Sequence, residues 1–278
     1  MISPNDILLT DQVAVVTGGA MGIGAGIAKG LASFGAHIVI ADIDVAAAEK
    51  TAALIREQGR QVLVVATDVM DKEQIKAMVA KTIAHFGRLD IFVNNVGGVR
   101  SSRFMDLSER SRERHVQINL MNLLACTEAA ARAMIDRGQG GNIINITSIE
   151  GQRAAPMFSV YAACKAAMNS FTRTTALELA EHGIRVNTIA PDIVDTEGAR
   201  TMNPGFYTAD TVARRSKYIP LGRDGIVDEI ASAAVFLASR MANYVTGAVL
   251  NVDGGTSASS GWLKSDDGGW SLYPGNFS

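Results

Sequence analysis

The sequence predicts an α/β fold in which a doubly wound parallel sheet of about seven strands lies between layers of helices. Short runs of consecutive apolar and β-branched residues recur along the chain, as expected for strands that are buried on both faces. Helical patterns separate these runs, and parallel strands need such crossover connections. The strands are expected at Val13–Val16, His37–Ala41, Val62–Ala66, Ile91–Val93, Asn142–Ile146, Ile184–Ile189 and Val249–Val252.

The segments between the strands show a helical period. Apolar residues at positions 23, 27, 31 and 34 step by four, four and three, and those at 75, 78, 79, 83 and 86 follow the same kind of spacing. No Pro/Gly/Ser-rich linker precedes residue 254, so we expect one domain over residues 1–255. Both tryptophans lie in the remaining segment, 256–278. Because large aromatic side chains are costly to leave in water, we expect this tail to pack on a protein surface, either that of its own subunit or, as the favoured alternative, one at a subunit interface.

Composition excludes several classes of protein. The chain is 47% hydrophobic and 19% charged, which indicates a folded protein, and its net charge of −2 disfavours nucleic acid as a partner. Cys126 and Cys164 lie in alanine-rich helical segments, so we expect no disulfide framework and a reducing compartment. The four histidines show no ligand spacing, which predicts no metal site. With no signal-like N-terminus and no apolar run of about 20 residues, the expected location is cytoplasmic rather than membrane-bound.

A glycine-rich segment connects the first strand to the first helix, as Thr17-Gly18-Gly19-Ala20-Met21-Gly22-Ile23-Gly24. Free N–H groups at a helix N-terminus bind a pyrophosphate, and glycines let the backbone approach it closely, so the segment predicts a Rossmann-like dinucleotide site. The second strand ends at Asp42, 18 residues past Gly24, where a carboxylate accepts hydrogen bonds from ribose hydroxyls and repels a 2′-phosphate. No Arg or Lys occupies positions 19–21 or 43–45, so we expect NAD rather than NADP.

A second constellation carries acid–base chemistry. Tyr161 and Lys165 are four residues apart in a helical stretch and therefore share a face, where an ammonium is expected to lower the tyrosine pKa and permit proton exchange. Ser148 follows the fifth strand, 13 residues before Tyr161, and Asn119 lies in a helical segment after the fourth strand.

Several ordered motifs resemble those of the classical short-chain dehydrogenase/reductase family over about residues 10–255. They are Thr17-Gly18-x-x-x-Gly22-Ile23-Gly24, Asn94-Asn95-Val96-Gly97, Asn119, Ser148, Tyr161-x-x-x-Lys165, and Pro191 followed by Thr196. The resemblance implies that Tyr161 exchanges the proton and Ser148 binds the substrate oxygen. It also implies that Lys165 tunes the tyrosine and holds the nicotinamide ribose, and that Asn119 positions a water in a proton relay.

The resemblance also implies a cofactor site and a homo-oligomer, most commonly a tetramer. Asp68 and Val69 would contact the adenine, Asn95 and Gly97 the adenosine ribose, and Pro191, Val194 and Thr196 the nicotinamide end. The full cofactor set is Gly18, Met21, Gly22, Ile23, Gly24, Asp42, Asp68, Val69, Asn95, Gly97, Tyr161, Lys165, Pro191, Val194 and Thr196. Two positions depart from the family pattern: Val96 replaces Ala, and Asp192 replaces Gly.

Substrate specificity is expected in three segments, namely Gly98–Phe104, Ile149–Phe158 and a lid over about Thr196–Tyr218. Arg100, Arg103 and Arg153 are candidates for binding an anionic substrate, although pairing with acidic neighbours such as Glu150 is the commoner role of such arginines. The apolar residues of these segments favour a cyclic, terpenoid or steroid secondary alcohol. An NAD-dependent alcohol dehydrogenase is therefore the main hypothesis. The alternatives are a 3-oxoacyl thioester reductase using NADPH and a non-catalytic dinucleotide-binding protein.

Overall fold

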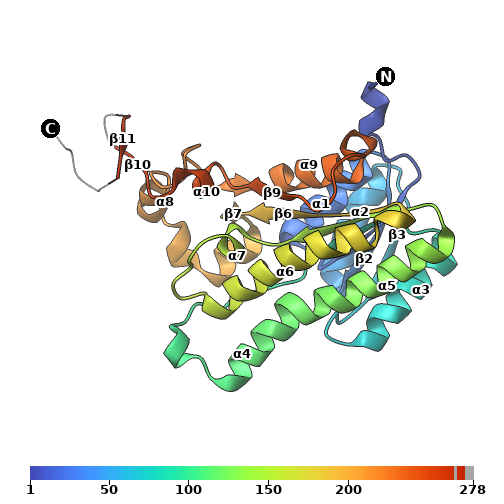
Figure 1. Cartoon of the computed structure of the whole chain (residues 1–278), viewed down its shortest axis with the longest axis horizontal. Coiled ribbons are helices and arrows are strands. Elements are labelled where there is room, and N and C mark those ends of the chain that lie inside the picture. Colours follow the sequence, from blue (N-terminus) through green and yellow to red (C-terminus); the bar gives the residue numbers. More distant parts are fainter. Residues whose placement is uncertain (266–267, 273–278) are drawn as a thin grey trace.

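The computed structural model describes residues 1–265 and 268–272, apart from the side chain of Met202. Its centre is a seven-stranded sheet in the order β3-β2-β1-β4-β5-β6-β9, in which every neighbouring pair is parallel (Figure 1). This confirms the predicted fold. The strands are β1 Val13–Thr17, β2 His37–Asp42, β3 Val62–Ala66, β4 Ile91–Asn94, β5 Gly141–Ile146, β6 Ile184–Pro191 and β9 Val249–Val252.

The strand order reverses beside β1, which pairs with β2 on one side and with β4 on the other. Val16 aligns with Ile40 of β2 and with Val93 of β4. At such a switch point the loops after β1 and β4 diverge and leave a crevice at the carboxyl ends of the strands, where ligands of doubly wound sheets bind. The site residues expected from the sequence follow these strand ends.

Helices cover both faces of the sheet. They are α1 Gly22–Ser33, α2 Val45–Glu57, α3 Lys72–Phe86, α4 Glu109–Val116, α5 Asn122–Arg137, α6 Ser159–Glu178, α7 Glu197–Met202, α8 Ala209–Arg215, α9 Val227–Ala238 and α10 Thr256–Ser259. One apolar core joins the sheet to α1, α2 and α9, and a second joins it to α3, α5 and α6. Where α1 crosses α9, a Cβ added at Gly30 would lie 2.9 Å from the Cβ of Ala231, so glycine permits this close helix contact.

A π-helical segment, Gln117–Met121, joins α4 to α5 and was not expected from the sequence. Short 3₁₀ helices occupy Pro4–Ile7, Phe104–Asp106, Ile149–Gly151, Ala180–His182, Pro204–Tyr207 and Arg240–Ala242. Beyond the sheet edge, β7 Val194–Asp195 pairs with β8 Gly225–Ile226. In the part of the chain that the structure describes, no helix is long and apolar enough to cross a membrane.

The C-terminal tail forms a small antiparallel hairpin, β10 Leu263–Lys264 and β11 Trp270–Ser271, that lies at the opposite end of the molecule from the N-terminus (Figure 1). The Lys264 N–H donates to the carbonyl of Lys217, which joins the hairpin to the segment after α8. Trp262 and Trp270 are about half exposed. The expected interface tail runs over 256–278, and its residues 266–267 and 273–278 lie outside the described part.

Candidate active site

The turn between β1 and α1 has the geometry that an anionic cofactor requires. Gly18 and Gly22 have positive φ of 63° and 58°, a backbone region that disfavours residues with a Cβ. Helix α1 begins at Gly22 without a side-chain cap on its first N–H groups. A Cβ at Gly24 would lie 2.1 Å from the carbonyl oxygen of Gly18, so the helix packs directly on the turn. Met21, 55% exposed, and Ile23 flank the helix start. Free N–H groups at the start of α1, and a turn without side chains that lets the backbone approach a ligand closely, are suited to binding a pyrophosphate.

Asn95 holds this turn against the end of β4. Its side-chain amide donates to the carbonyl oxygens of Thr17 at 3.0 Å and Gly18 at 3.2 Å, and its backbone N–H donates to the Thr17 hydroxyl at 3.0 Å. The two sides of the crevice are therefore fixed to each other before any ligand binds.

Asp42 ends β2 beside the same turn. One carboxylate oxygen accepts the backbone N–H of Ala20 at 2.9 Å, and the other accepts that of Asp44 at 3.0 Å. Each carboxylate oxygen accepts about two hydrogen bonds, so both retain capacity for ribose hydroxyls. Asp68 follows β3, accepts the N–H of Met70 at 2.9 Å, and precedes the buried Val69. Both carboxylates therefore lie where the adenosine half of a dinucleotide is expected.

Tyr161 lies in the first turn of α6, and its phenol lies beside the side chain of Ser148, which follows β5. Burial raises the pKa of Tyr161 to about 12, the Ser148 hydrogen bond lowers it, and the Glu150 carboxylate raises it further. From the sequence, we expect the ammonium of Lys165 to lower this pKa. In the structure burial dominates, so the phenol stays protonated at neutral pH.

Lys165 is buried one helical turn after Tyr161. Its Nζ donates to the carbonyl oxygen of Ile146 at 3.0 Å and lies 5.5 Å from the centre of the Tyr161 ring. Burial lowers the pKa of Lys165 to about 8. An ammonium therefore persists beside the phenol at neutral pH.

Asn119 lies in the π-helical segment and is fully buried. Its Oδ1 accepts the N–H of Gly98 at 3.0 Å, and its Nδ2 donates to the carbonyl oxygens of Gly98 at 2.8 Å and His115 at 2.9 Å. The side chain thus satisfies a helix carbonyl and ties α4 to the loop after β4. π-helical turns are frequent at functional sites.

Gly97 separates Asn119 from Lys165. A Cβ at this position would lie 2.9 Å from Asn119 Oδ1 and 3.2 Å from Lys165 Nζ. Glycine therefore leaves a small space that both polar atoms border. The relay that the family resemblance implies requires a water molecule between these groups.

The segment after β6 closes the other side of the crevice. Pro191 and Val194 are buried, and the hydroxyl of Thr196 caps α7 by accepting the Ala199 N–H at 3.1 Å. Methyl Cγ2 of Thr196 lies 3.8 Å from the position of a Cβ at Gly22. The loop after β6 therefore comes within van der Waals distance of the glycine-rich turn.

A charged cluster that was not expected from the sequence follows Ser148 and consists of Glu150, Arg153 and Asp192. Arg153 binds both oxygens of Glu150, at 2.7 and 3.3 Å, and its guanidinium lies 4.0 Å from the carboxylate of Asp192. The pairing of Arg153 with Glu150 agrees with the commoner role expected for it. Asp192 comes from the end of β6, 39 positions away, and no local pattern in the sequence links it to Arg153.

The three expected specificity segments lie at this edge of the sheet. In the first, the backbone N–H of Arg100 donates to His115 Nε2 at 3.2 Å, and Arg103 precedes a 3₁₀ turn. The third contains α7 and α8 and is braced by Arg215, which is buried, pairs with Asp224 and stacks on Phe206 at 4.0 Å. A metal ion has no cluster of three His, Cys, Asp or Glu ligands among the described residues.

Comparisons with known proteins agree with this geometry. A family model described as enoyl-(acyl carrier protein) reductase matches residues 18–257. A galactitol 2-dehydrogenase of Agrobacterium fabrum is 40% identical over 253 residues, 89% of this chain and 98% of that protein. A 3-oxoacyl-(acyl-carrier-protein) reductase of Chlamydia trachomatis is 39% identical over 249 residues, again 89% of this chain and 98% of that protein.

Solved structures give the same relationship. A short-chain type dehydrogenase/reductase from Mycobacterium marinum has a TM-score of 0.85 at 32% identity and covers 91% of this chain and 98% of its own. A gluconate 5-dehydrogenase from Burkholderia cenocepacia, in complex with NADP and tartrate, has a TM-score of 0.85 at 35% identity with the same coverage. The chain therefore belongs to the classical short-chain dehydrogenase/reductase family, whose members of this kind are oxidoreductases acting on alcohols and ketones.

Proposed function

We propose that the protein is an NAD-dependent dehydrogenase that interconverts a secondary alcohol and its ketone, with Tyr161, Ser148, Lys165 and Asn119 as the catalytic groups. The observation that carries this proposal is the juxtaposition of the Tyr161 phenol with the Ser148 hydroxyl and with the Lys165 Nζ, which lies 5.5 Å from the centre of the tyrosine ring. Bound NAD would accept a hydride from the alcohol carbon. The protein must then remove the hydroxyl proton and stabilise the oxygen as its charge changes.

Each catalytic side chain has a distinct part in this proposal. The phenol of Tyr161 exchanges the proton, and the Ser148 hydroxyl holds the reacting oxygen. The Lys165 ammonium supplies positive charge beside the phenol, and Asn119 holds the loop and the space through which a proton reaches solvent. Because the pKa of Tyr161 is raised to about 12, ketone reduction is favoured at neutral pH and alcohol oxidation at alkaline pH.

NAD preference rests on Asp42. Its carboxylate lies beside the glycine-rich turn through the Ala20 N–H, where a 2′-phosphate would meet like charge. The test is a titration with NADH and NADPH, followed by nicotinamide fluorescence, before and after Asp42→Ala. Tighter NADH binding that is lost in the variant supports the proposal. Tighter NADPH binding by the unaltered protein would favour the 3-oxoacyl thioester reductase, to which the Chlamydia trachomatis relative also points.

For the substrate, we propose a neutral polyol. This is supported by the Glu150–Arg153–Asp192 cluster, which has charged hydrogen-bonding groups on the loops that follow Ser148 and Pro191, and by the relative of highest identity reported above, which is named for galactitol. The sequence-based preference for an apolar cyclic alcohol is the competing prediction. Sorbitol and cyclohexanol, each supplied with NAD, distinguish the two. The Tyr161→Phe variant should turn over neither alcohol but should still bind NADH. If the unaltered protein binds NADH and turns over no alcohol, the chain is instead a non-catalytic dinucleotide-binding protein.

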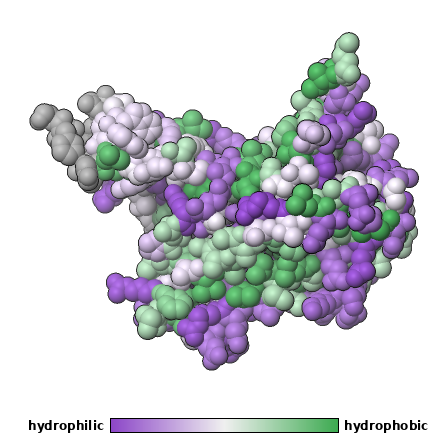
Figure 2. Space-filling view, viewed as in Figure 1, coloured by the Kyte–Doolittle hydropathy of each residue, from purple (hydrophilic) through white to green (hydrophobic). Residues whose placement is uncertain are grey.

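We also propose that residues 1–255 form the cofactor-binding and catalytic domain and that the protein is a homotetramer. Hydrophobic side chains gather over α5 and α6 (Figure 2), and Leu177 of α6 is 78% exposed. Such a surface favours association with a second copy. Sedimentation should give four times the 29.4 kDa mass of the chain. The cytoplasmic location stays a prediction.

A further inference from the structure

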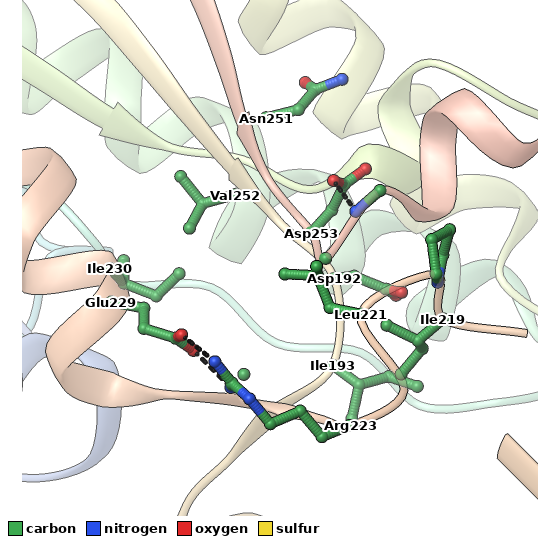
Figure 3. Close-up of a pocket in the computed structure, with 14 residues that line it drawn as sticks. Asp192, Ile193, Ile219, Leu221, Arg223, Glu229, Ile230, Asn251, Val252 and Asp253 are labelled. Carbon is green, nitrogen blue, oxygen red and sulfur yellow. Dashed lines mark hydrogen bonds and ion pairs between the residues drawn. The ribbon is translucent and has the colours of Figure 1, made fainter. Parts of the chain in front are cut away.

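The carboxylate of Asp192 lies at the carboxyl end of β6, directly after Pro191, and lines a cavity of about 430 Å³ (Figure 3). Its side chain is 10% exposed. Much of the remaining wall is apolar and includes Ile193, Ile219 and Leu221. A charged group in such surroundings is costly unless its hydrogen bonds are satisfied.

The carboxylate of Asp192 is incompletely satisfied by the protein. The hydroxyl of Thr256, beside it, donates to the carbonyl oxygen of Asp253 at 2.9 Å, and Arg153 lies 4.0 Å from the carboxylate, beyond the distance of a hydrogen bond. Two carboxylate oxygens accept about four hydrogen bonds. Burial raises the pKa of Asp192, which agrees with this incomplete compensation. The carboxylate of Asp192 can therefore accept further hydrogen bonds from a ligand in the cavity.

Arg153 lies on the loop that begins at Ser148. It binds the carboxylate of Glu150, and the backbone N–H of Glu150 donates to Ser148 Oγ at 3.1 Å in the turn that follows β5. Arg153 is 41% exposed, so part of its guanidinium is free to donate to a ligand. The cluster therefore offers a donor and an acceptor side by side, at the end of the strand that precedes the expected nicotinamide contacts.

The charge balance selects the kind of group that fits. The carboxylates of Glu150, Asp192 and Asp253 all act on the single guanidinium of Arg153. The cluster is therefore net negative, which repels a carboxylate on the substrate, while a neutral hydroxyl both donates to Asp192 and accepts from Arg153. An apolar group would leave both charged groups without those bonds.

We propose that Asp192 and Arg153 determine specificity by binding substrate hydroxyl groups adjacent to the reacting carbon, so that neutral polyols are preferred over apolar alcohols and over sugar acids. This inference rests on the proposed alcohol-dehydrogenase function and assigns its specificity to two residues. Asp192 stands where the family pattern has glycine, so the acceptor is a feature of this chain.

The test measures kcat and KM with NAD for sorbitol, cyclohexanol and gluconate in the unaltered protein, Asp192→Asn and Arg153→Met. Both variants should lower kcat/KM for sorbitol by about tenfold or more, mainly through KM, because Asp192→Asn removes the charge that strengthens the hydrogen bond from the substrate hydroxyl and Arg153→Met removes the donor. Turnover of cyclohexanol should change by less than about twofold, and Asp192→Asn should improve gluconate. The matched controls are Glu128→Gln and Arg132→Met, which alter an exposed carboxylate–guanidinium pair on α5.

Equal losses for sorbitol and cyclohexanol in both variants would overturn the specificity assignment, because they would indicate a structural defect. Oxidation of cyclohexanol but not sorbitol by the unaltered protein would also overturn it and leave NAD-dependent alcohol oxidation intact. Failure to oxidise any of the three would count against the proposed function itself. Binding of sorbitol to the enzyme–NADH complex, followed by fluorescence, then decides the specificity assignment separately: weaker binding to Asp192→Asn supports it, and unchanged binding refutes it.

Discussion

Replacing Lys165 with Met should stabilise the protein at neutral pH while abolishing turnover. Burial lowers the lysine pKa from 10.5 to about 8, a difference that corresponds to about 3 kcal/mol. At pH 7 the lysine is protonated in both the folded and the unfolded chain, so the folded protein bears the full cost of the buried ammonium. As pH rises from 8 to 10.5 the folded protein loses this proton first, and the cost disappears.

Methionine removes the charge and also the hydrogen bond from Nζ to the Ile146 carbonyl. Losing that bond costs about 1–2 kcal/mol. The net gain at pH 7 is therefore about 2 kcal/mol, equivalent to an increase in Tm of about 4 °C for a chain of this length. At pH 10 the gain should vanish or reverse.

The assay is thermal unfolding at pH 7 and pH 10 at one protein concentration. Lys81→Met, which changes an exposed lysine of α3, is the control and should leave Tm unchanged at both pH values. A Lys165→Met protein that is less stable than the unaltered protein by the same amount at both pH values would refute the reasoning. It would show that the ammonium carries no desolvation cost in the folded state.

Four further predictions follow from the contacts described above. Gly97→Ala places a methyl group within 3.2 Å of two catalytic polar atoms and should lower kcat by about 10- to 100-fold, whereas Gly98→Ala, which meets nothing within 4 Å, should not. Glu150→Gln removes a carboxylate that raises the pKa of Tyr161, so the alkaline rise in alcohol oxidation should move to lower pH; an unchanged profile contradicts this. Asp90→Asn breaks a buried pairing with two arginines and should cost about 3 kcal/mol in urea unfolding at pH 7; a cost below about 1 kcal/mol would show that the pairing contributes little. A chain ending at Gly261 lacks both tryptophans and should sediment as a smaller species if the tail joins subunits; an unchanged mass removes the motive for that idea.

Local patterns in the sequence were sufficient to predict the sheet and the glycine-rich turn between β1 and α1. Strands that are buried on both faces consist of continuous apolar runs in the sequence. Each expected run lies within or matches a strand of the observed sheet. The positions of the glycine-rich turn and of Asp42 could also be predicted from the sequence, because the turn, the helix start and the strand end are each defined by a few neighbouring residues. Their contact through the Ala20 N–H follows from the parallel pairing of β1 and β2.

Other features depend on contacts between distant segments and could not be predicted. The pairing of Arg153 with Asp192 requires the loop after β5 to lie beside the end of β6. The raised pKa of Tyr161 reflects burial by the whole site, whereas sequence spacing reveals only its neighbour Lys165. The π-helical segment could not be predicted because one extra residue in a turn barely alters the spacing of apolar residues. The nearest indication in the sequence is the pair Asn119 and Asn122, whose side-chain amides donate to carbonyl oxygens four residues earlier.

The π-helical segment is the one place in this helical region where the chain can lose a residue without turning the helices against each other. An α-helix advances by about 100° per residue, so deleting one residue from the α-helical part of α5 would rotate the residues beyond the deletion by roughly that angle. A π-helical turn holds one residue more than an α-helical turn, so deleting one residue from Gln117–Met121 would leave an α-helical turn and keep the face of α5 that contains Cys126, Ala130 and Met134 against the sheet. What such a deletion would displace is Asn119, so the extra residue positions this side chain and is not needed for the packing of α5.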